Sequence, residues 1–178
     1  LKHFPIKTNK VEVIYEAAVK TPLKWSQQSH SLEVTRSTKC LEDPRTVGRA
    51  ILKRYKIKKP YIIYVGNVYP HKNLRRLILA IKILNSSIIN HQSSAINLVI
   101  VCARSVFYQR LKKEVKELRA ERFVNLPGFV PDKNLAILYF QAKAYISSSL
   151  MEGFGLPGVE AMQSGCPVVC SNIPTFKE

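Results

Sequence analysis

The sequence lacks any apolar run long enough to cross a membrane as a helix. Its longest apolar runs, such as residues 96–103, are far shorter than the roughly 20 residues that a spanning helix needs. It also shows no collagen period and no heptad array, and its 46% apolar and 22% charged residues are close to the average of soluble globular proteins. These features predict a folded globular domain.

Cysteine is scarce, and its positions form no metal-binding pattern. The cysteines stand at 40, 102, 166 and 170, without paired Cys-x-x-Cys spacing or histidine clusters, so no zinc site is predicted. Cys166 and Cys170 fall on one expected strand and would share a face. We expect buried free thiols in a reducing compartment, which favours a cytoplasmic protein.

Acidic residues are few. The sequence has 12 Asp and Glu and 28 Lys and Arg, which gives a net charge of +16. A surface this basic attracts nucleic acids, anionic lipids or phosphorylated small ligands. The densest basic stretch, residues 45–59, is either the solvated face of a helix and the following turn or a patch for an anionic membrane. Nucleic acid is the least favoured partner, since no known module and no aromatics interleaved with basic residues support it.

Short apolar runs alternate with amphipathic helical segments from residue 60 onward. The runs lack the alternation of a half-buried strand, which is typical of strands buried on both faces of a parallel sheet. The pattern therefore predicts a doubly wound α/β domain with helices on both faces. Strands are expected at 61–65, 96–101, 123–126, 144–148 and 167–170, and helices at 44–55, from a cap at Asn73 onward, at 106–120, from a cap at Asp132 to 142, and up to Gly165.

Two unusual turns follow the first and fourth expected strands. Right-handed crossovers place all strand-to-helix turns on one edge of such a sheet, and ligands bind where the strand order reverses. With the common order 3-2-1-4-5, the reversal lies between the first and fourth strands. The turns that would meet there are residues 66–73, Gly-Asn-Val-Tyr-Pro-His-Lys-Asn, and residues 152–160, Glu-Gly-Phe-Gly-Leu-Pro-Gly-Val-Glu.

The second turn has a Gly-x-Gly-x-x-Gly spacing at Gly153, Gly155 and Gly158, between two carboxylates. Glycines allow a ligand to approach the backbone, and free N–H groups at a helix start favour an anion or an oxygen-rich ligand. Glu160, about one turn into the helix, is suited to accept from both hydroxyls of a ribose. The alternatives are a surface acid for Glu160 and a helix-dipole partner for Glu152.

The first turn offers a cation close to a helix start. Lys72 stands where its ammonium and the helix N–H groups are suited to hold one diphosphate together. His71 offers a further donor. The alternatives are a solvated lysine and a surface or packing histidine.

At these residues the sequence resembles the nucleotide-binding half of the family-4 retaining glycosyltransferases, the glycosyl transferases group 1, which have the two-domain GT-B fold. Residues 64–74 resemble the glycine turn with its phosphate lysine, and residues 124–130 resemble the strand and turn beside the base pocket. Residues 152–160 resemble the Glu-x7-Glu motif, the most specific of the three. The likeness covers residues 60–176, and residues 9–20 more faintly resemble the crossover from the acceptor domain.

The resemblance implies a domain layout. Residues 1–20 would be the tail of an acceptor domain and the interdomain crossover, with a strand at 11–15, and residues 21–59 a linker or loop followed by a helix. Residues 60–178 would be a Rossmann-like domain that binds a nucleotide sugar. Because the chain opens without Met and stops just past the fifth expected strand, we expect a truncated fragment that lacks nearly all of the acceptor domain.

The resemblance also implies roles for the residues of the two turns. Lys72 would neutralise the diphosphate as the sugar leaves, Glu152 would contact the donor sugar, and Glu160 would hold the ribose hydroxyls. Gly66 would let the diphosphate approach the backbone, and Val130 would face the base through its backbone. Further donor contacts would come from Asn67, His71 and the N–H groups of Gly153, Phe154, Gly155 and Leu156.

The implied reaction transfers a sugar from a nucleoside-diphosphate sugar to a sugar or lipid-linked acceptor with retention of anomeric configuration. It belongs to polysaccharide biosynthesis and needs no metal or other cofactor, since positive charge in the protein meets the leaving diphosphate. We expect a cytoplasmic protein, with peripheral contact to an anionic membrane as a further hypothesis. The fragment alone should be inactive, because a cleft needs two lobes to exclude water and orient the acceptor.

The sequence departs from the family at specific positions. Asn67 and His71 stand where different members carry an arginine, and Cys102-Ala103 replaces the glycine usual after the second strand. One phosphate contact is therefore in doubt, although Arg75, Arg76 or Arg104 are substitutes to consider. These departures leave open a second hypothesis, a non-catalytic nucleotide-binding module. A basic nucleic-acid-binding domain is a third hypothesis and rests on charge alone.

Overall fold

Five parallel strands form one sheet in the computed structural model, which describes residues 44–90 and 95–177. The strand order is β3-β2-β1-β4-β5, the common order under which the two unusual turns were expected to meet. In register, β1 pairs with β2 along its whole length and with β4 through Ile63 and Tyr145. The strands are β1 (Tyr61–Val65), β2 (Asn97–Val101), β3 (Val124–Gly128), β4 (Tyr145–Ser147) and β5 (Val168–Cys170).

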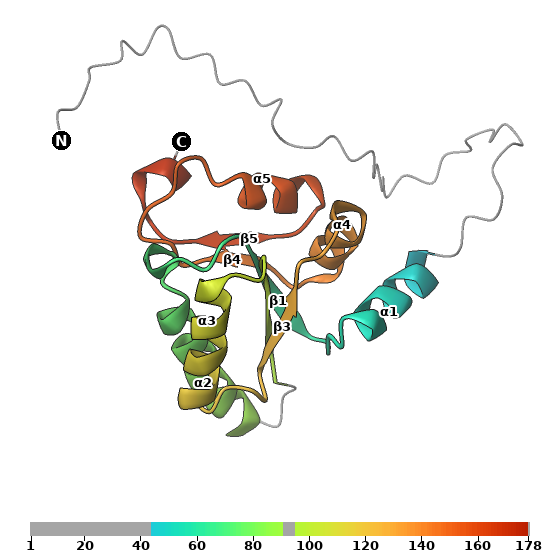
Figure 1. Cartoon of the computed structure of the whole chain (residues 1–178). Helices are drawn as coiled ribbons and strands as arrows, with labels where there is room; N and C mark the ends of the chain where they lie inside the picture. Colours follow the sequence, from blue (N-terminus) through green and yellow to red (C-terminus); the bar gives the residue numbers. More distant parts are fainter. Residues whose placement is uncertain (1–43, 91–94, 178) are drawn as a thin grey trace, which may run out of the picture.

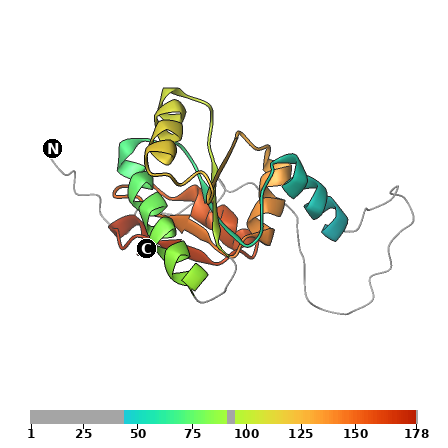
Figure 2. The ribbon, with the colours of Figure 1, turned by 90° about the horizontal axis from the view of Figure 1, so that it is seen from below.

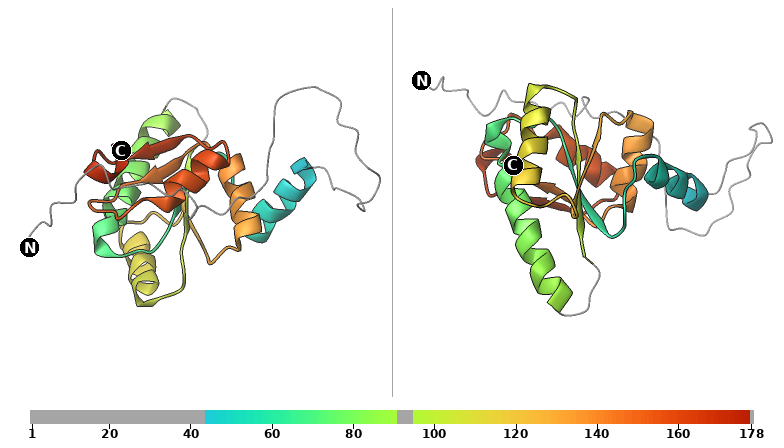
Figure 3. Two further views of the ribbon diagram at one scale, coloured as in Figure 1. Left: turned by 90° about the horizontal axis from the view of Figure 1, so that it is seen from above. Right: turned by 60° about the horizontal axis from the view of Figure 1, so that its bottom comes forward.

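Helices cover both faces of this sheet, as predicted for a doubly wound domain. Figure 3 shows α2 and α3 on the side of the sheet opposite α4, and Figures 1 and 2 show α1 beside α4 at one end of the molecule. The helices are α1 (Pro44–Arg54), α2 (Leu74–Asn90), α3 (Val106–Glu117), α4 (Asp132–Gln141) and α5 (Leu156–Gln163), with the 3-10 helices η3 (Pro70–Lys72) and η4 (Pro174–Phe176).

The apolar runs divide their side chains between two cores. Ile63 and Val99 pack on one face with residues of α1, α4 and α5, whereas Tyr64 and Leu98 pack on the other face with α2 and α3. Successive residues of a strand point to opposite faces. Both faces need apolar residues because both are covered by helices, which explains why the runs lack alternation.

Several predicted boundaries were wrong by a few residues, and the backbone gives the reasons. Helix α3 ends at Glu117 instead of 120, because Arg119 takes a left-handed conformation with φ 51° and the Ala120 amide donates to the Val115 carbonyl. Strand β3 runs through Gly128 instead of ending at 126, since the Cys102 amide donates to the Gly128 carbonyl and extends the pairing.

Asn73 stands directly before α2 as predicted, and its carbonyl accepts from the Leu77 amide, but the predicted cap at Asp132 was wrong. Asn73 is left-handed (φ 58°, ψ 30°), and its side-chain amide donates to the Ser148 carbonyl. Pro131 takes the cap position of α4, so Asp132 is the first helical residue and forms no capping bond. A carboxylate in a first helical turn still interacts favourably with the helix dipole.

The cysteine prediction was right for two of the described residues and wrong for the third. Cys102 and Cys166 are buried free thiols, but Cys170 is exposed because β5 is an edge strand. Cys40, the expected strand at 11–15, the loop at 21–42 and the whole of the expected acceptor-domain tail and crossover at 1–20 lie outside the described residues. None of the described helices combines the length and apolar character needed to cross a bilayer.

Candidate functional site

The two unusual turns meet at the carboxyl ends of β1 and β4. Lys72 ends η3, which follows β1, and its Nζ donates to Oε2 of Glu152 at 2.6 Å. Both side chains are mostly shielded from solvent, with 11% and 15% exposed. The pair forms because β1 and β4 are neighbours, so the turns that follow them leave the sheet side by side.

Backbone contacts hold the first turn against the end of β4. The Leu150 amide donates to the His71 carbonyl at 2.8 Å, and the Ser148 hydroxyl donates to the Lys72 carbonyl at 2.9 Å. The Tyr64 hydroxyl donates to the Asn67 carbonyl at 2.7 Å from the buried face of β1. These bonds fix the backbone that carries Lys72, so its ammonium starts from a defined position.

Beside the ion pair lies a hollow of about 240 Å³. Its wall combines one ammonium, one carboxylate, glycine backbone and the first residues of α5, which is the composition expected for a phosphate- or sugar-sized polar ligand. Tyr64 and Tyr145 form its floor, and burial raises the pKa of both phenols, so both stay neutral. The lining includes the predicted residues Gly66, Asn67, Lys72, Glu152, Phe154, Gly155 and Leu156.

Two glycines in this wall are required by the backbone. Gly155 precedes α5 with φ 83°, and a Cβ there would lie 2.5 Å from the ring of Phe176. Gly66 has φ 143°, and a Cβ there would lie 3.3 Å from the Tyr64 hydroxyl. Residues that carry a side chain rarely adopt these φ values. The glycines therefore keep the backbone at the rim of the hollow bare.

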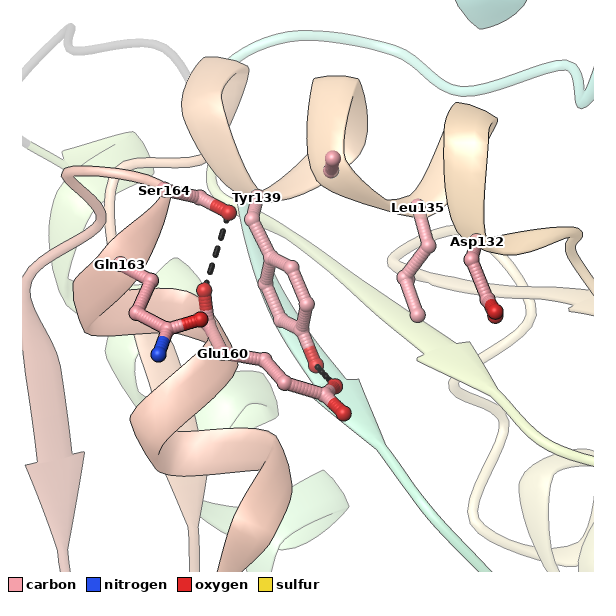
Figure 4. Close-up of a pocket in the computed structure, with 7 residues that line it drawn as sticks. Asp132, Leu135, Tyr139, Glu160, Gln163 and Ser164 are labelled. Carbon is pink, nitrogen blue, oxygen red and sulfur yellow. Dashed lines mark hydrogen bonds between the residues drawn. The ribbon is translucent and has the colours of Figure 1, made fainter. Parts of the chain in front are cut away.

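Glu160 lines a second, smaller hollow of about 70 Å³ (Figure 4). Its Oε2 accepts a long hydrogen bond from the Tyr139 hydroxyl at 3.4 Å. Partial burial raises the pKa of Glu160 and the nearby Asp132 charge adds to the rise, while the Tyr139 hydrogen bond opposes it. Leu156, which lines the larger hollow, and Glu160, which lines the smaller one, are one helical turn apart on the same face of α5.

Three predicted site residues lie outside both hollows. The Val130 side chain is buried in the core, with 2% exposed. His71 is exposed, and its ring lies 5.9 Å from the ring of Tyr69. Gly153 is exposed, with nothing within 4 Å of the position of a Cβ.

Sequence reasoning missed the serines that follow β4 and the tyrosines that flank the site. Ser149 is fully buried and its hydroxyl donates to Oε1 of Glu152 at 2.6 Å. The run Ser147-Ser148-Ser149 immediately before the Glu152 turn was the available signal, because buried hydroxyls need partners. In the part of the chain that the structure describes, no three His, Cys, Asp or Glu side chains gather as a metal site would require.

The model of the family described as glycosyl transferases group 1 matches residues 49–178. The chain belongs to this family. Two curated relatives are the O-antigen chain mannosyltransferase RfbU of Salmonella typhimurium, 35% identical over 75% of this chain, and the O-antigen chain mannosyltransferase B of Escherichia coli, 31% identical over 82% of this chain. The chain spans 35% and 38% of their lengths, so it corresponds to a little over a third of each.

Solved glycosyltransferases share its fold. HepE of Anabaena, crystallised with UDP and glucose, superposes with a TM-score of 0.60 at 17% identity, over 76% of this chain and 36% of HepE. WaaG, a glycosyltransferase involved in lipopolysaccharide biosynthesis, superposes with a TM-score of 0.58 at 19% identity, over 72% of this chain and 33% of WaaG. The described part of the chain is thus a Rossmann-like domain of the GT-B type, as the resemblance implied.

Proposed function

We propose that this chain supplies the donor-binding half of a glycosyltransferase that uses a nucleoside-diphosphate sugar and retains the anomeric configuration. The observation that supports this best is the Lys72–Glu152 pair, which faces a hollow walled by glycine backbone and by the start of α5. A single ammonium at a helix start suits a diphosphate, and the neighbouring carboxylate suits sugar hydroxyls. Membership of the glycosyl transferases group 1 family points to the same chemistry.

In the proposed mechanism the diphosphate lies between Lys72 and the backbone N–H groups that lead into α5, from Gly153 to Leu156. Negative charge grows on the diphosphate as the bond to the sugar breaks, and a cation already held in place lowers the energy of that state more than that of the bound donor. Glu152 contacts the donor sugar and holds the ammonium on its other side. These groups are preorganised, because the backbone around both is hydrogen-bonded without a ligand.

Glu160 is proposed to accept from the ribose hydroxyls of the same donor. It lies one turn beyond Leu156 on α5, so a nucleotide that binds its phosphates at the start of α5 reaches Glu160 with its ribose. Backbone groups near Val130 would lie on the base side. Because the Val130 side chain is in the core, only its main chain is available for such a contact.

The names of the two curated relatives suggest the transferred sugar. Both are O-antigen chain mannosyltransferases, which favours a mannosyl donor and a sugar or lipid-linked acceptor in polysaccharide biosynthesis. Titration of the complete protein with guanosine and uridine diphosphates by calorimetry tests the donor site and identifies its base: one should bind at least tenfold more tightly, whereas no binding of either would contradict a donor site.

A second candidate function is a nucleotide-binding module without catalysis. It is favoured by Asn67 and His71, which replace arginine at both positions where family members carry one. Transfer activity of the complete protein decides between the candidates: a Glu152→Ala variant that transfers as fast as the wild type would favour the binding module. A cytoplasmic location and contact of the exposed basic residues of α1 with an anionic membrane stay predictions.

A further inference from the structure

The two carboxylate oxygens of Glu152 have different hydrogen-bond donors. Oε2 accepts from Lys72 Nζ and Oε1 accepts from the Ser149 hydroxyl, each at 2.6 Å. Hydrogen bonds to a charged group are short and strong. A carboxylate held by one partner can still turn about its last bond, but one held at both oxygens cannot.

The direction of the bond from Ser149 is determined by its neighbours. The Ser147 hydroxyl donates to the Ser149 hydroxyl at 3.2 Å, and a hydroxyl has one proton to give. Because a carboxylate only accepts, the Ser149 proton goes to Glu152. Ser147 and Ser149 are both buried, so no water competes for these bonds.

The backbone on either side of this contact is held as well. The Thr175 hydroxyl donates to the Glu152 carbonyl at 2.9 Å, and the Ser171 hydroxyl donates to the Ser149 carbonyl. The Ser171 amide also donates to the Ser147 carbonyl at 2.9 Å, beside β5. The segment from β4 to Glu152 is thus attached along its length to the segment after β5.

We propose that Ser149 is a positioning residue that orients the carboxylate of Glu152 and, through it, the ammonium of Lys72. A lysine has a flexible side chain and three N–H donors, so its ammonium keeps one position only when a hydrogen-bond partner of fixed position holds it. Glu152 is such a partner only while the orientation of its carboxylate is fixed. This inference rests on the proposed function, because it assigns a role in the reaction to the site at Lys72 and Glu152.

The proposal predicts a distinctive kinetic effect. The donor would still contact Lys72, the start of α5 and Glu160 in a Ser149→Ala variant, so its KM should change less than about twofold. The reacting geometry would loosen, and misplacement of a reacting group by about 1 Å can cost as much as 10²-fold in rate. We therefore expect kcat to fall by about tenfold.

The test is a double-mutant cycle in the complete protein, with Ser149→Ala, Glu152→Ala and both together. If Ser149 acts through Glu152, the double variant should have the kcat of Glu152→Ala alone, because the effects are coupled. An unchanged kcat in Ser149→Ala, or a second loss of the same size in the double variant, would overturn the proposal. If Ser149→Ala does not fold, Ser149→Cys fills the same space with a much weaker donor and should show the same loss.

A control variant and a second readout separate this proposal from the proposed function. Ser86→Ala removes an exposed hydroxyl on α2 that bonds only to the Lys82 carbonyl, and it should behave as the wild type. The same cycle measured by urea unfolding should be non-additive, since Ser149 and Glu152 share one hydrogen bond; additive losses would rule out the contact. The proposed function would instead be contradicted by a wild-type protein without transfer activity or by a fully active Glu152→Gln variant. In either case the unfolding cycle would still decide whether Ser149 holds Glu152.

Discussion

The ammonium of Lys72 and the carboxylate of Glu152 lie 2.6 Å apart, although 80 positions separate them in the chain. Each belongs to a different strand-to-helix turn, and the adjacency of β1 and β4 brings the turns together. Because the Lys72 charge is paired with Glu152, the proposed affinity for a diphosphate should depend on both residues. Substitutions at either one should therefore affect the donor, but in different ways.

Replacing Lys72 with alanine should weaken nucleoside-diphosphate binding by about 1.5–3 kcal/mol, the range for a hydrogen bond to a charged group. The Glu152 carboxylate would also face the incoming phosphate without a cation between them. Calorimetry measures the loss. Lys113→Ala, an exposed lysine of α3, is the matched control and should bind as the wild type. Equal affinity of the two variants for the nucleoside diphosphate would contradict a role of Lys72 in donor binding.

Replacing Glu152 with glutamine should lower kcat by about 10²–10³-fold, the size seen when one preorganised electrostatic group is removed. Glutamine keeps the shape but loses the charge that orients Lys72. Steady-state transfer assays of the complete protein provide the measurement. A kcat within twofold of the wild type would favour the binding module over the transferase.

Replacing Gly155 with alanine should lower the free energy of unfolding by at least about 1–2 kcal/mol, the cost of a left-handed conformation for a residue with a Cβ. The clash with Phe176 would add to this cost. Gly153→Ala, two residues earlier, meets nothing within 4 Å and should stay within about 0.5 kcal/mol of the wild type. Urea unfolding of both variants compares the two sites, and equal losses would contradict the backbone argument.

Replacing Glu160 with glutamine should stabilise the fold at neutral pH and weaken nucleoside binding. Burial raises the folded pKa of Glu160 above its unfolded value of about 4.3. A raised pKa makes ionisation unfavourable to the folded state, so the cost is absent below the unfolded pKa and complete above the folded pKa. The variant and the wild type should unfold alike near pH 3 and diverge as the pH rises. Calorimetry should show nucleoside-diphosphate binding weakened by about 1–2 kcal/mol, because contacts to the ribose are lost. An unchanged affinity would contradict a contact between Glu160 and the donor.

The chain by itself should bind a nucleoside diphosphate without transferring sugar. The described residues form one domain with a polar hollow beside Lys72 and Glu152, and the chain corresponds to a little over a third of its curated relatives. Orientation of an acceptor and exclusion of water require a second surface across the hollow. Calorimetry and a radiolabelled transfer assay on the purified 178-residue chain test both halves of this expectation. Robust transfer would show that the catalytic groups are complete in this chain.

Element boundaries show where prediction from sequence succeeded and where it did not. The strand at Tyr61–Val65 was predicted to the residue, because an apolar run with a proline before it and a glycine after it has few alternatives. Helix α3 was predicted too long because its end depends on the left-handed turn at Arg119, which no composition signal marks. Cys170 was predicted buried because the sequence does not show that β5 lies at an edge.

The sequence alone determined that the domain has a parallel sheet covered by helices and which two turns carry the polar residues, because apolar runs and glycine–proline punctuation act locally and the handedness of crossovers is nearly invariant. Only the tertiary structure decided that Lys72 and Ser149 take opposite oxygens of Glu152, that Glu160 pairs with Tyr139 in a separate hollow, and that the Val130 side chain belongs to the core. Such partners follow from how helices and strands pack around each other. The hydrogen-bond partner of a side chain can come from any of several helices, strands or turns. Which partner it has is therefore decided only when all of these elements are packed together.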